Sequence, residues 1–218
     1  MALYLGVLSQ KGGVGKSTVS RLLAREYAVN GWEIKIADFD TAQSTNYKWQ
    51  SRRLARDIEP TIPVEQFKKV NSAIRVGEAY DLMILDGAAQ TTQTTSAIAK
   101  SSDFIVIPTG TVIDDLEPAV ILANDVVKDG VAIDRIALVL SRTGKSQVEI
   151  NEARAYLDKT PYYIVPGELP ESGGYKRASN QGKTPTETAF PALNERADKV
   201  AQALVNRFQK ILDLREVA

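Results

Sequence analysis

The sequence contains neither cysteine nor histidine among its 218 residues. Their absence excludes thiol chemistry, iron–sulfur ligation and zinc sites of the usual kind, and it leaves only oxygen ligands for a bound metal. A chain without cysteine is compatible with the cytoplasm, which is the location we expect. The sequence also has no net charge of either sign, because its 27 basic residues balance its 27 acidic residues. Nucleic-acid binding would therefore need a local patch of charge rather than a global field.

Long apolar segments and a basic leader are missing too. The chain enters a strand-like run at residues 3–8, so we expect neither a signal peptide nor a membrane span. Hydrophobic residues make up 44% of the sequence, which is ample for the core of a single α/β domain over residues 1–218.

The most informative part of the chain is rich in glycine and lysine. Residues 9–18 read SQKGGVGKST, and their end, Gly15-Lys16-Ser17, matches the phosphate-loop pattern G-x-x-x-x-G-K-[ST] with its first glycine replaced. A strand-like run precedes this segment, and apolar residues at helical spacing follow it as far as Asn30-Gly31. Strand, loop and helix in this order predict a phosphate site at the N-terminus of the helix.

Backbone N–H groups of this loop are expected to surround phosphate oxygens. The predicted nucleotide-binding residues are Gly12, Gly13, Val14, Gly15, Lys16, Ser17 and Thr18. Lys16 would reach the β- and γ-phosphates, and the Ser17 hydroxyl would ligate Mg²⁺. Lys11 is not needed to bind the nucleotide of its own chain, because Lys16 already supplies the lysine for its phosphates. We therefore expect Lys11 to point toward a nucleotide held by a second copy of the chain.

Strand-like and helical patterns alternate along the rest of the sequence. This alternation predicts an α/β fold with a doubly wound, mainly parallel sheet whose ligand lies at the C-terminal strand ends. The expected strands cover residues 3–8, 34–38, 61–64, 81–86, 104–108, 136–140 and 162–165. After the helix that follows the glycine loop, further helices are expected over residues 45–56, 67–78, 116–127, 148–157 and 193–212.

Acidic residues follow two of these strands. Asp86 ends the strand at 81–86, which is the place for a carboxylate that holds the Mg²⁺ shell. Asp38 and Asp40 end the strand at 34–38, beside the glycine loop in this topology. We expect Asp38 to join Ser17 and Asp86 around the metal. Asp40 lies further out and is the better candidate to orient the water that attacks the γ-phosphate.

These motifs resemble those of the ParA/MinD family. Residues 11–18 resemble its deviant Walker A box, Asp38-Phe39-Asp40 its A′ box, and residues 83–86 its Walker B box. The region from Gly174 to Glu187 is similar to the late segment of short plasmid-type ParA partition proteins. The resemblance implies a Mg²⁺-dependent ATPase that dimerises around two ATP molecules, with Lys11 crossing to the partner's phosphates. It also implies that the ATP-bound dimer binds DNA without sequence preference. A ParB-type or other cargo adaptor would then stimulate hydrolysis and release the dimer.

Further candidates carry less specific signals. Ser141-Arg142 stands where relatives often have an asparagine near the base, so Arg142 is a candidate for nucleotide contact. Lys176, Arg177 and Lys183 are candidate DNA contacts. The apolar stripe near the C-terminus could belong to a membrane-targeting helix, but its spacing favours an ordinary core helix and no stable membrane insertion.

Two other functions fit the same motifs. A metabolic P-loop enzyme, such as a dethiobiotin-synthetase-like ligase, shares the expected fold. A membrane-associated regulator of the MinD type shares the second lysine. The sequence does not identify the cargo, which could be a plasmid, an integrated element or a protein body.

Overall fold

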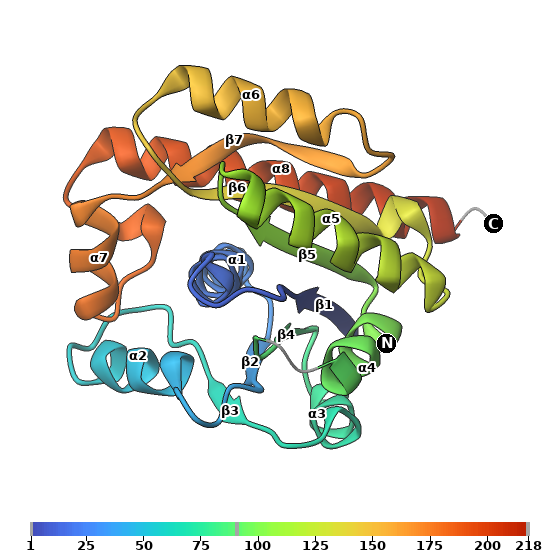
Figure 1. Cartoon of the computed structure of the whole chain (residues 1–218). Coiled ribbons are helices and arrows are strands. Elements are labelled where there is room, and N and C mark those ends of the chain that lie inside the picture. Colours follow the sequence, from blue (N-terminus) through green and yellow to red (C-terminus); the bar gives the residue numbers. More distant parts are fainter. Residues whose placement is uncertain (1, 90–91, 217–218) are drawn as a thin grey trace.

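The computed structural model describes residues 2–89 and 92–216. Within them, seven parallel strands form one sheet in the order β3-β2-β4-β1-β5-β6-β7 (Figure 1). The strands are β1 (Leu3–Val7), β2 (Ile34–Asp38), β3 (Val64–Gln66), β4 (Leu82–Asp86), β5 (Phe104–Thr109), β6 (Ile136–Thr143) and β7 (Tyr163–Pro170). The predicted doubly wound parallel sheet is confirmed. Because β1 lies in the middle and the chain winds outward on both sides of it, the crevice beside β1 is where such folds bind ligands.

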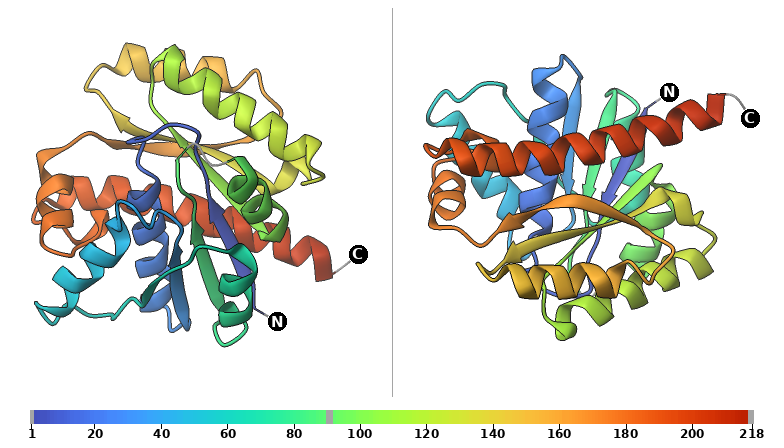
Figure 2. Two further views of the ribbon diagram at one scale, coloured as in Figure 1. Left: turned by 60° about the horizontal axis from the view of Figure 1, so that its bottom comes forward. Right: turned by 90° about the horizontal axis from the view of Figure 1, so that it is seen from above.

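Helices cover both faces of the sheet (Figures 1 and 2). One face packs against α1 (Lys16–Val29), α2 (Thr45–Leu54), α7 (Gly173–Asn180) and α8 (Pro191–Glu216). The other packs against α3 (Val70–Gly77), α4 (Thr92–Ser101), α5 (Ile113–Lys128) and α6 (Gln147–Leu157). Two short 3-10 turns, η1 (Ile133–Arg135) and η2 (Pro185–Glu187), complete the described elements.

Strand β4 shows how this arrangement positions the polar edge of the sheet. Alternate side chains of a strand face opposite sides, so Leu82 and Ile84 enter the core under α1 and α8, whereas Met83 and Leu85 enter the other core. All four are fully buried. The register pairs Asp86 with Asp38 of β2 and with Val7 of β1, which ends just before the glycine loop. The loop and both acids therefore meet at one edge.

Helix α8 crosses the sheet as one long element (Figure 2). Its stripe of Val200, Leu204, Phe208 and Ile211 is buried, and the Phe208 ring stacks on Phe104 of β5 at 5.4 Å between centroids. The expected core helix is thus confirmed. No helix in the described part of the chain has the length and apolar character needed to cross a bilayer.

Several element boundaries differ from the sequence-based expectation. The strand expected over 61–64 begins only at Val64, because Pro63 has no N–H to donate to the ladder. Helix α5 begins at Ile113 rather than 116; its two acids in the first turn favour that start, and Pro118 lies inside the helix. Helices α4 and α7 were not expected, since one is rich in threonine and the other opens with two glycines.

Candidate functional site

A cavity of about 650 Å³ opens at the carboxyl edge of the sheet. It lies between the glycine loop, the end of β4, the loop after β2, the ends of β6 and β7, and helix α7. The predicted site residues that line it are Gly12, Gly13, Gly15, Lys16, Ser17, Thr18, Asp40, Asp86, Arg142, Lys176 and Lys183. Lys11, Val14, Asp38 and Arg177 lie outside this lining. The volume is in the range of small-molecule sites.

The glycine loop is shaped to leave its backbone exposed to the cavity. Gly13 and Gly15 have φ angles of 82° and 103°, which side chains other than glycine rarely adopt. A Cβ on Gly15 would also overlap the hydroxyl of Ser141 on β6. No side chain caps α1, so the first N–H groups of the helix are left for an external acceptor. An anion is the ligand that this helix N-terminus favours.

The two lysines of the loop take separate positions. Lys16 lies in the cavity, where its Nζ donates to the Lys11 carbonyl oxygen at 3.2 Å. Burial lowers the pKa of Lys16, and the charges of Asp86 and Asp40 oppose that effect. The ammonium of Lys11 instead pairs with Asp115 Oδ1 in the first turn of α5, at 2.7 Å. Lys16 is therefore the lysine available to a phosphate in the cavity, and Lys11 is held apart from it.

The end of β4 carries the polar group best suited to a metal. Asp86 is 3% exposed, and its Oδ2 accepts hydrogen bonds from Ser17 Oγ at 2.8 Å and from the Asn46 side-chain amide. Its Oδ1 is buried and has no hydrogen-bond partner in the described part of the chain. Burial raises the pKa of Asp86, and the bonds from Ser17 and Asn46 act against this. A hydroxyl beside an unpaired carboxylate oxygen fits a hard cation such as Mg²⁺.

Asp38 lies next to Asp86 but is engaged differently. Its Oδ1 accepts the N–H of Asp40 at 3.0 Å and its Oδ2 accepts the N–H of Asn46 at 3.1 Å, so this side chain shapes the loop after β2. Burial and then the charge of Asp86 raise the pKa of Asp38 to about 6. Two adjacent buried acids favour a cation between or beside them. Over residues 2–89 and 92–216, no group of three or more acidic side chains could hold a metal alone.

Asp40 lies on the cavity rim in the same loop. Its Oδ1 accepts the N–H of Gln43 at 3.0 Å, and the side chain is half-buried. Lys16 also lines this cavity, and the negative charge of Asp40 raises the pKa of Lys16 against the larger, opposite effect of burial. The position is compatible with the expected role of Asp40 in orienting a water molecule.

The opposite rim carries two predicted candidates, Arg142 and Lys176, joined by a carboxylate that the sequence did not indicate. Arg142, which adopts a left-handed φ of 56°, donates to the Gly13 carbonyl oxygen of the glycine loop. It also pairs with Glu171 at 3.1 Å, and Lys176 pairs with the same carboxylate oxygen at 2.6 Å. Arg142 is thus bonded to the loop backbone and to Glu171. Glu171 follows β7 and carries no motif of its own, so only the fold brings it to the cavity.

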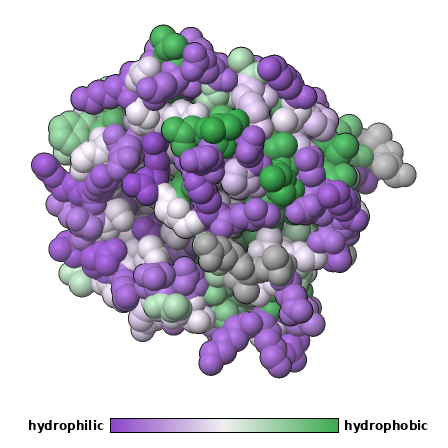
Figure 3. Space-filling model, viewed as in Figure 1, coloured by the Kyte–Doolittle hydropathy of each residue, from purple (hydrophilic) through white to green (hydrophobic). Residues whose placement is uncertain are grey.

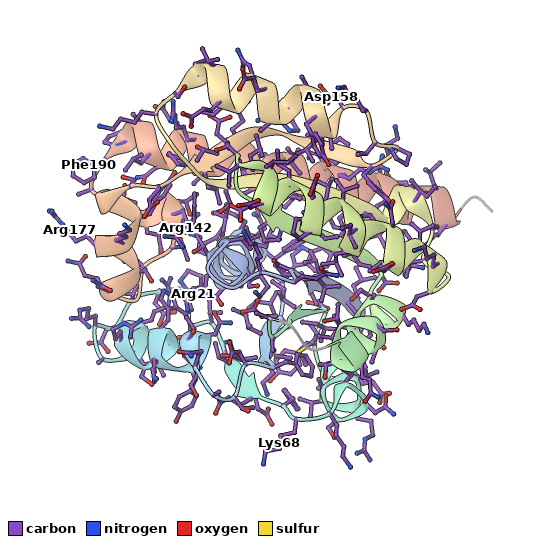
Figure 4. The ribbon with its side chains drawn as sticks, in the orientation of Figure 1. Arg21, Lys68, Arg142, Asp158, Arg177 and Phe190 are labelled. Atoms are coloured by element: carbon purple, nitrogen blue, oxygen red, sulfur yellow. The ribbon has the colours of Figure 1, made fainter. Side chains whose placement is uncertain are left out.

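The three basic residues predicted to bind DNA separate in the structure. Lys176 and Lys183 line the cavity, although the Lys176 side chain is 65% exposed. Arg177 is exposed and points outward from α7 (Figure 4). A single outward patch of all three is therefore not formed.

Comparison with known proteins agrees with this site. A family model described as the CobQ/CobB/MinD/ParA nucleotide binding domain matches residues 5–186. The chain belongs to this family. No curated protein sequence matches the chain.

Solved structures of low sequence identity share the fold. A putative plasmid partition protein from Borrelia burgdorferi B31, bound to AMPPNP, gives a TM-score of 0.72 at 15% identity, over 95% of this chain and 100% of that one. McdA from Cyanothece, in complex with ATP, gives 0.67 at 17% identity, over 94% and 96%. MinD from Pyrococcus horikoshii OT3, complexed with Mg-ADP, gives 0.70 at 16% identity, over 100% and 98%.

Proposed function

We propose that this protein is a Mg²⁺-dependent ATPase that positions cargo on DNA. It binds ATP in the cavity, dimerises around two nucleotides, and holds DNA without sequence preference while ATP is bound. A ParB-type or other cargo adaptor stimulates hydrolysis and releases the dimer. The observation that carries this proposal is the separation of the two loop lysines, since Lys16 lies in the cavity and Lys11 pairs with Asp115 outside it.

The surface around Lys11 supports association with a second copy. The Lys11 side chain is 43% exposed, and Asp115 is in the first turn of α5. Beside them, Val112 and Ile113 are 56% and 49% exposed, and Figure 3 shows apolar side chains gathered over this part of the molecule. Exposed apolar side chains next to a charged residue are typical of a protein–protein interface. A metabolic ligase of the same fold would have no use for this second lysine.

Each step of the reaction has residues to perform it. The N–H groups at the start of α1 and the Lys16 ammonium hold the phosphates. Ser17 and Asp86 would hold Mg²⁺, which would supply positive charge beside the phosphates. Ser17 can do this without losing Asp86, because a hydroxyl donates one proton to the carboxylate and keeps lone pairs for a metal. Asp40 on the rim orients the attacking water.

The DNA-binding part of the proposal concerns helix α7. Arg177 is exposed there, and a dimer would present this residue twice. Two weak basic contacts on one assembly bind a polyanion far better than either alone, and such binding weakens steeply with salt. We therefore expect a gel shift with DNA of any sequence that requires ATP and disappears at high salt. Arg177→Ala should weaken this shift without changing nucleotide affinity, and equal binding with ADP would contradict the nucleotide switch.

The decisive experiment changes Lys11. Lys11→Gln should leave ATP binding by the monomer intact and remove both ATP-dependent dimerisation and adaptor-stimulated hydrolysis. Light scattering with a non-hydrolysable ATP analogue measures the first loss, and phosphate release measures the second. Lys68→Gln is the matched control, since Lys68 is an exposed lysine far from the cavity (Figure 4). A Lys11 variant that dimerises and hydrolyses normally would make a metabolic P-loop enzyme the better explanation.

A further inference from the structure

A buried chain of hydrogen bonds joins the carboxylate of Asp86 to helix α7. Arg21 of α1 is 4% exposed, and its Nε donates to Asn46 Oδ1 at 2.8 Å. The Asn46 side-chain amide donates in turn to Asp86 Oδ2. At its other end, the Arg21 guanidinium donates through Nη1 to Ser179 Oγ of α7 at 3.1 Å. Figure 4 places Arg21 between α1 and the neighbouring helix α2.

Chemistry fixes the direction of every bond in this chain. The guanidinium of Arg21 can only donate, and an ionised carboxylate can only accept. Asn46 must therefore turn its oxygen to Arg21 and its NH₂ to Asp86, and a flipped amide would place donor against donor and oxygen against oxygen. The backbone N–H of Asn46 also donates to Asp38 Oδ2 at 3.1 Å. Asn46 is fully buried and touches both acids of the site.

These bonds decide which oxygen of Asp86 is available. Oδ2 is held by Ser17 and Asn46, and Oδ1 is the buried oxygen without a partner in the described structure. Rotation of the carboxylate away from this position would break both hydrogen bonds to Oδ2 at once. The Asn46 amide therefore keeps Oδ1 as the oxygen without a hydrogen bond, the one left for a metal, and Arg21 keeps the amide in place.

The segment that follows α7 is also held by side chains close to this network. The Trp49 indole of α2 is fully buried, lies 5.3 Å from the Arg21 guanidinium carbon, and donates to the Lys183 carbonyl oxygen at 3.0 Å. Arg53 donates to the Gly182 carbonyl oxygen at 3.1 Å. Ser179 thus ties α7 to Arg21, and the segment directly after α7 is held by Trp49, which lies against Arg21, and by Arg53.

We propose that Arg21 and Asn46 are positioning residues that hold Asp86 in its metal-binding orientation and couple that orientation to the seating of helix α7. This inference rests on the proposed function for the identity of the metal. Coupling of this kind is reciprocal, so whatever displaces α7 weakens metal binding, and metal binding favours the seated helix. Because α7 also carries exposed Arg177, a macromolecule bound there would act on the metal site through Ser179 and Arg21.

Ser179 offers the first test, because it lines the cavity and its hydroxyl accepts a hydrogen bond from Arg21, whereas no described hydrogen bond joins it to Ser17, Asn46 or Asp86. Ser179→Ala should raise the Mg²⁺ concentration needed for tight binding of a fluorescent ATP analogue by about threefold, as expected for the indirect loss of one hydrogen bond. Because Ser179 lines the cavity, the affinity without Mg²⁺ is measured for each variant, and the expected change of about threefold is relative to that baseline. Ser179→Thr keeps the hydroxyl and should restore the parent value. Asn46→Ala, which removes the direct contact, should raise the Mg²⁺ requirement about 10- to 100-fold.

Controls separate this inference from the proposed function. Ser51→Ala removes a hydroxyl from the exposed side of α2, where it bonds only to the Tyr47 carbonyl oxygen, and should leave Mg²⁺ binding unchanged. In a Trp32→Phe background, the fluorescence of Trp49 reports the network directly and should respond to Mg²⁺ with nucleotide in the parent but less in Ser179→Ala. A parent that needs no Mg²⁺ for nucleotide affinity would refute the metal assignment. If the parent does need Mg²⁺ but Ser179→Ala behaves like the parent, or Ser179→Thr fails to restore the parent value, the inference is overturned and the proposed function is not affected.

Discussion

Release of Lys11 from Asp115 should strengthen ATP-dependent dimerisation. In the monomer this lysine is paired at 2.7 Å with a carboxylate of its own chain, so it must leave that partner before it can reach a second subunit. Two features hold the Asp115 carboxylate in position to pair with Lys11. It lies in the first turn of α5, where the helix dipole favours a negative charge. Its Oδ2 also packs so closely on Gly110 that a Cβ there would overlap it.

The size of the effect follows from the exposure of the pair. The two side chains are 43% and 23% exposed, so solvent screens the attraction and the pair contributes only about 0.5–1 kcal/mol. That energy favours the paired Lys11 by roughly 2- to 5-fold. A dimer releases two such lysines, and the two sites act independently before contact. Asp115→Asn should therefore lower the dimer dissociation constant by roughly 4- to 25-fold.

Sedimentation or light scattering with a non-hydrolysable ATP analogue measures this constant. Asp114→Asn is the matched control, because Asp114 is exposed in the same helical turn and makes no contact with Lys11. Gly110→Ala should act in the same direction as Asp115→Asn by pushing the carboxylate away. In a Lys11→Gln background, which should already lack ATP-dependent dimerisation, Asp115→Asn should not restore it. Dimerisation that is unchanged or weaker in Asp115→Asn would refute the reasoning, since it would mean that Asp115 does not restrain Lys11.

Three further predictions test the cavity. Lys16→Ala should weaken Mg-ATP binding about 100-fold, because it removes the charged donor nearest the phosphates; parent-like affinity in a fluorescence titration would place the nucleotide elsewhere. Asp40→Ala should bind ATP normally and accumulate as a dimer while phosphate release falls about 10²- to 10⁴-fold; unchanged turnover would shift the water-orienting role to Asp38. The third prediction concerns pH in the metal-free protein. The pKa of Asp38 is about 6 when folded against an ordinary 3.8, so the folded state holds this proton more tightly. Its contribution to stability is therefore present below pH 4 and lost as the pH rises through 6, an effect on the order of 3 kcal/mol. Asp38→Asn should flatten this pH dependence in urea unfolding, and an unaltered slope would contradict the assignment.

The parts of this molecule that could be predicted from sequence are those encoded locally. Strand β4 is a continuous apolar run that ends in Asp86, and the glycine loop is followed at once by helical spacing. Short-range patterns of this kind give the element type, and parallel topology then brings the strand ends together. Boundaries were less accurate at β3 and α5. There Pro63 and Pro118 act in opposite ways, the first delaying a strand and the second being tolerated inside a helix.

Residues that depend on the folded chain could not be predicted. Arg21 reaches Ser179 across 158 positions, and Arg142 reaches Gly13 across 129. Nothing in the sequence around Glu171 indicates that it receives both Arg142 and Lys176. The same limit explains why the three basic residues assigned to DNA looked alike in sequence. Their surroundings differ because α7, an element without a clear helical pattern, carries Lys176 and Arg177 on different sides, while Lys183 lies in the segment after the helix and lines the cavity.

The distribution of cations around the cavity implies an order of events. Lys11, Arg142 and Lys176 each rest on a carboxylate of the same chain. Lys16 rests only on a carbonyl oxygen among the described contacts, and carbonyls hold an ammonium less strongly than carboxylates do. A triphosphate therefore meets Lys16 and the N-terminus of α1 first, without breaking an ion pair. Lys11 is recruited later, when a second subunit supplies an anion that competes with Asp115. Under the proposed function, the restraint on Lys11 thus favours nucleotide binding before association by roughly 2- to 5-fold for each subunit.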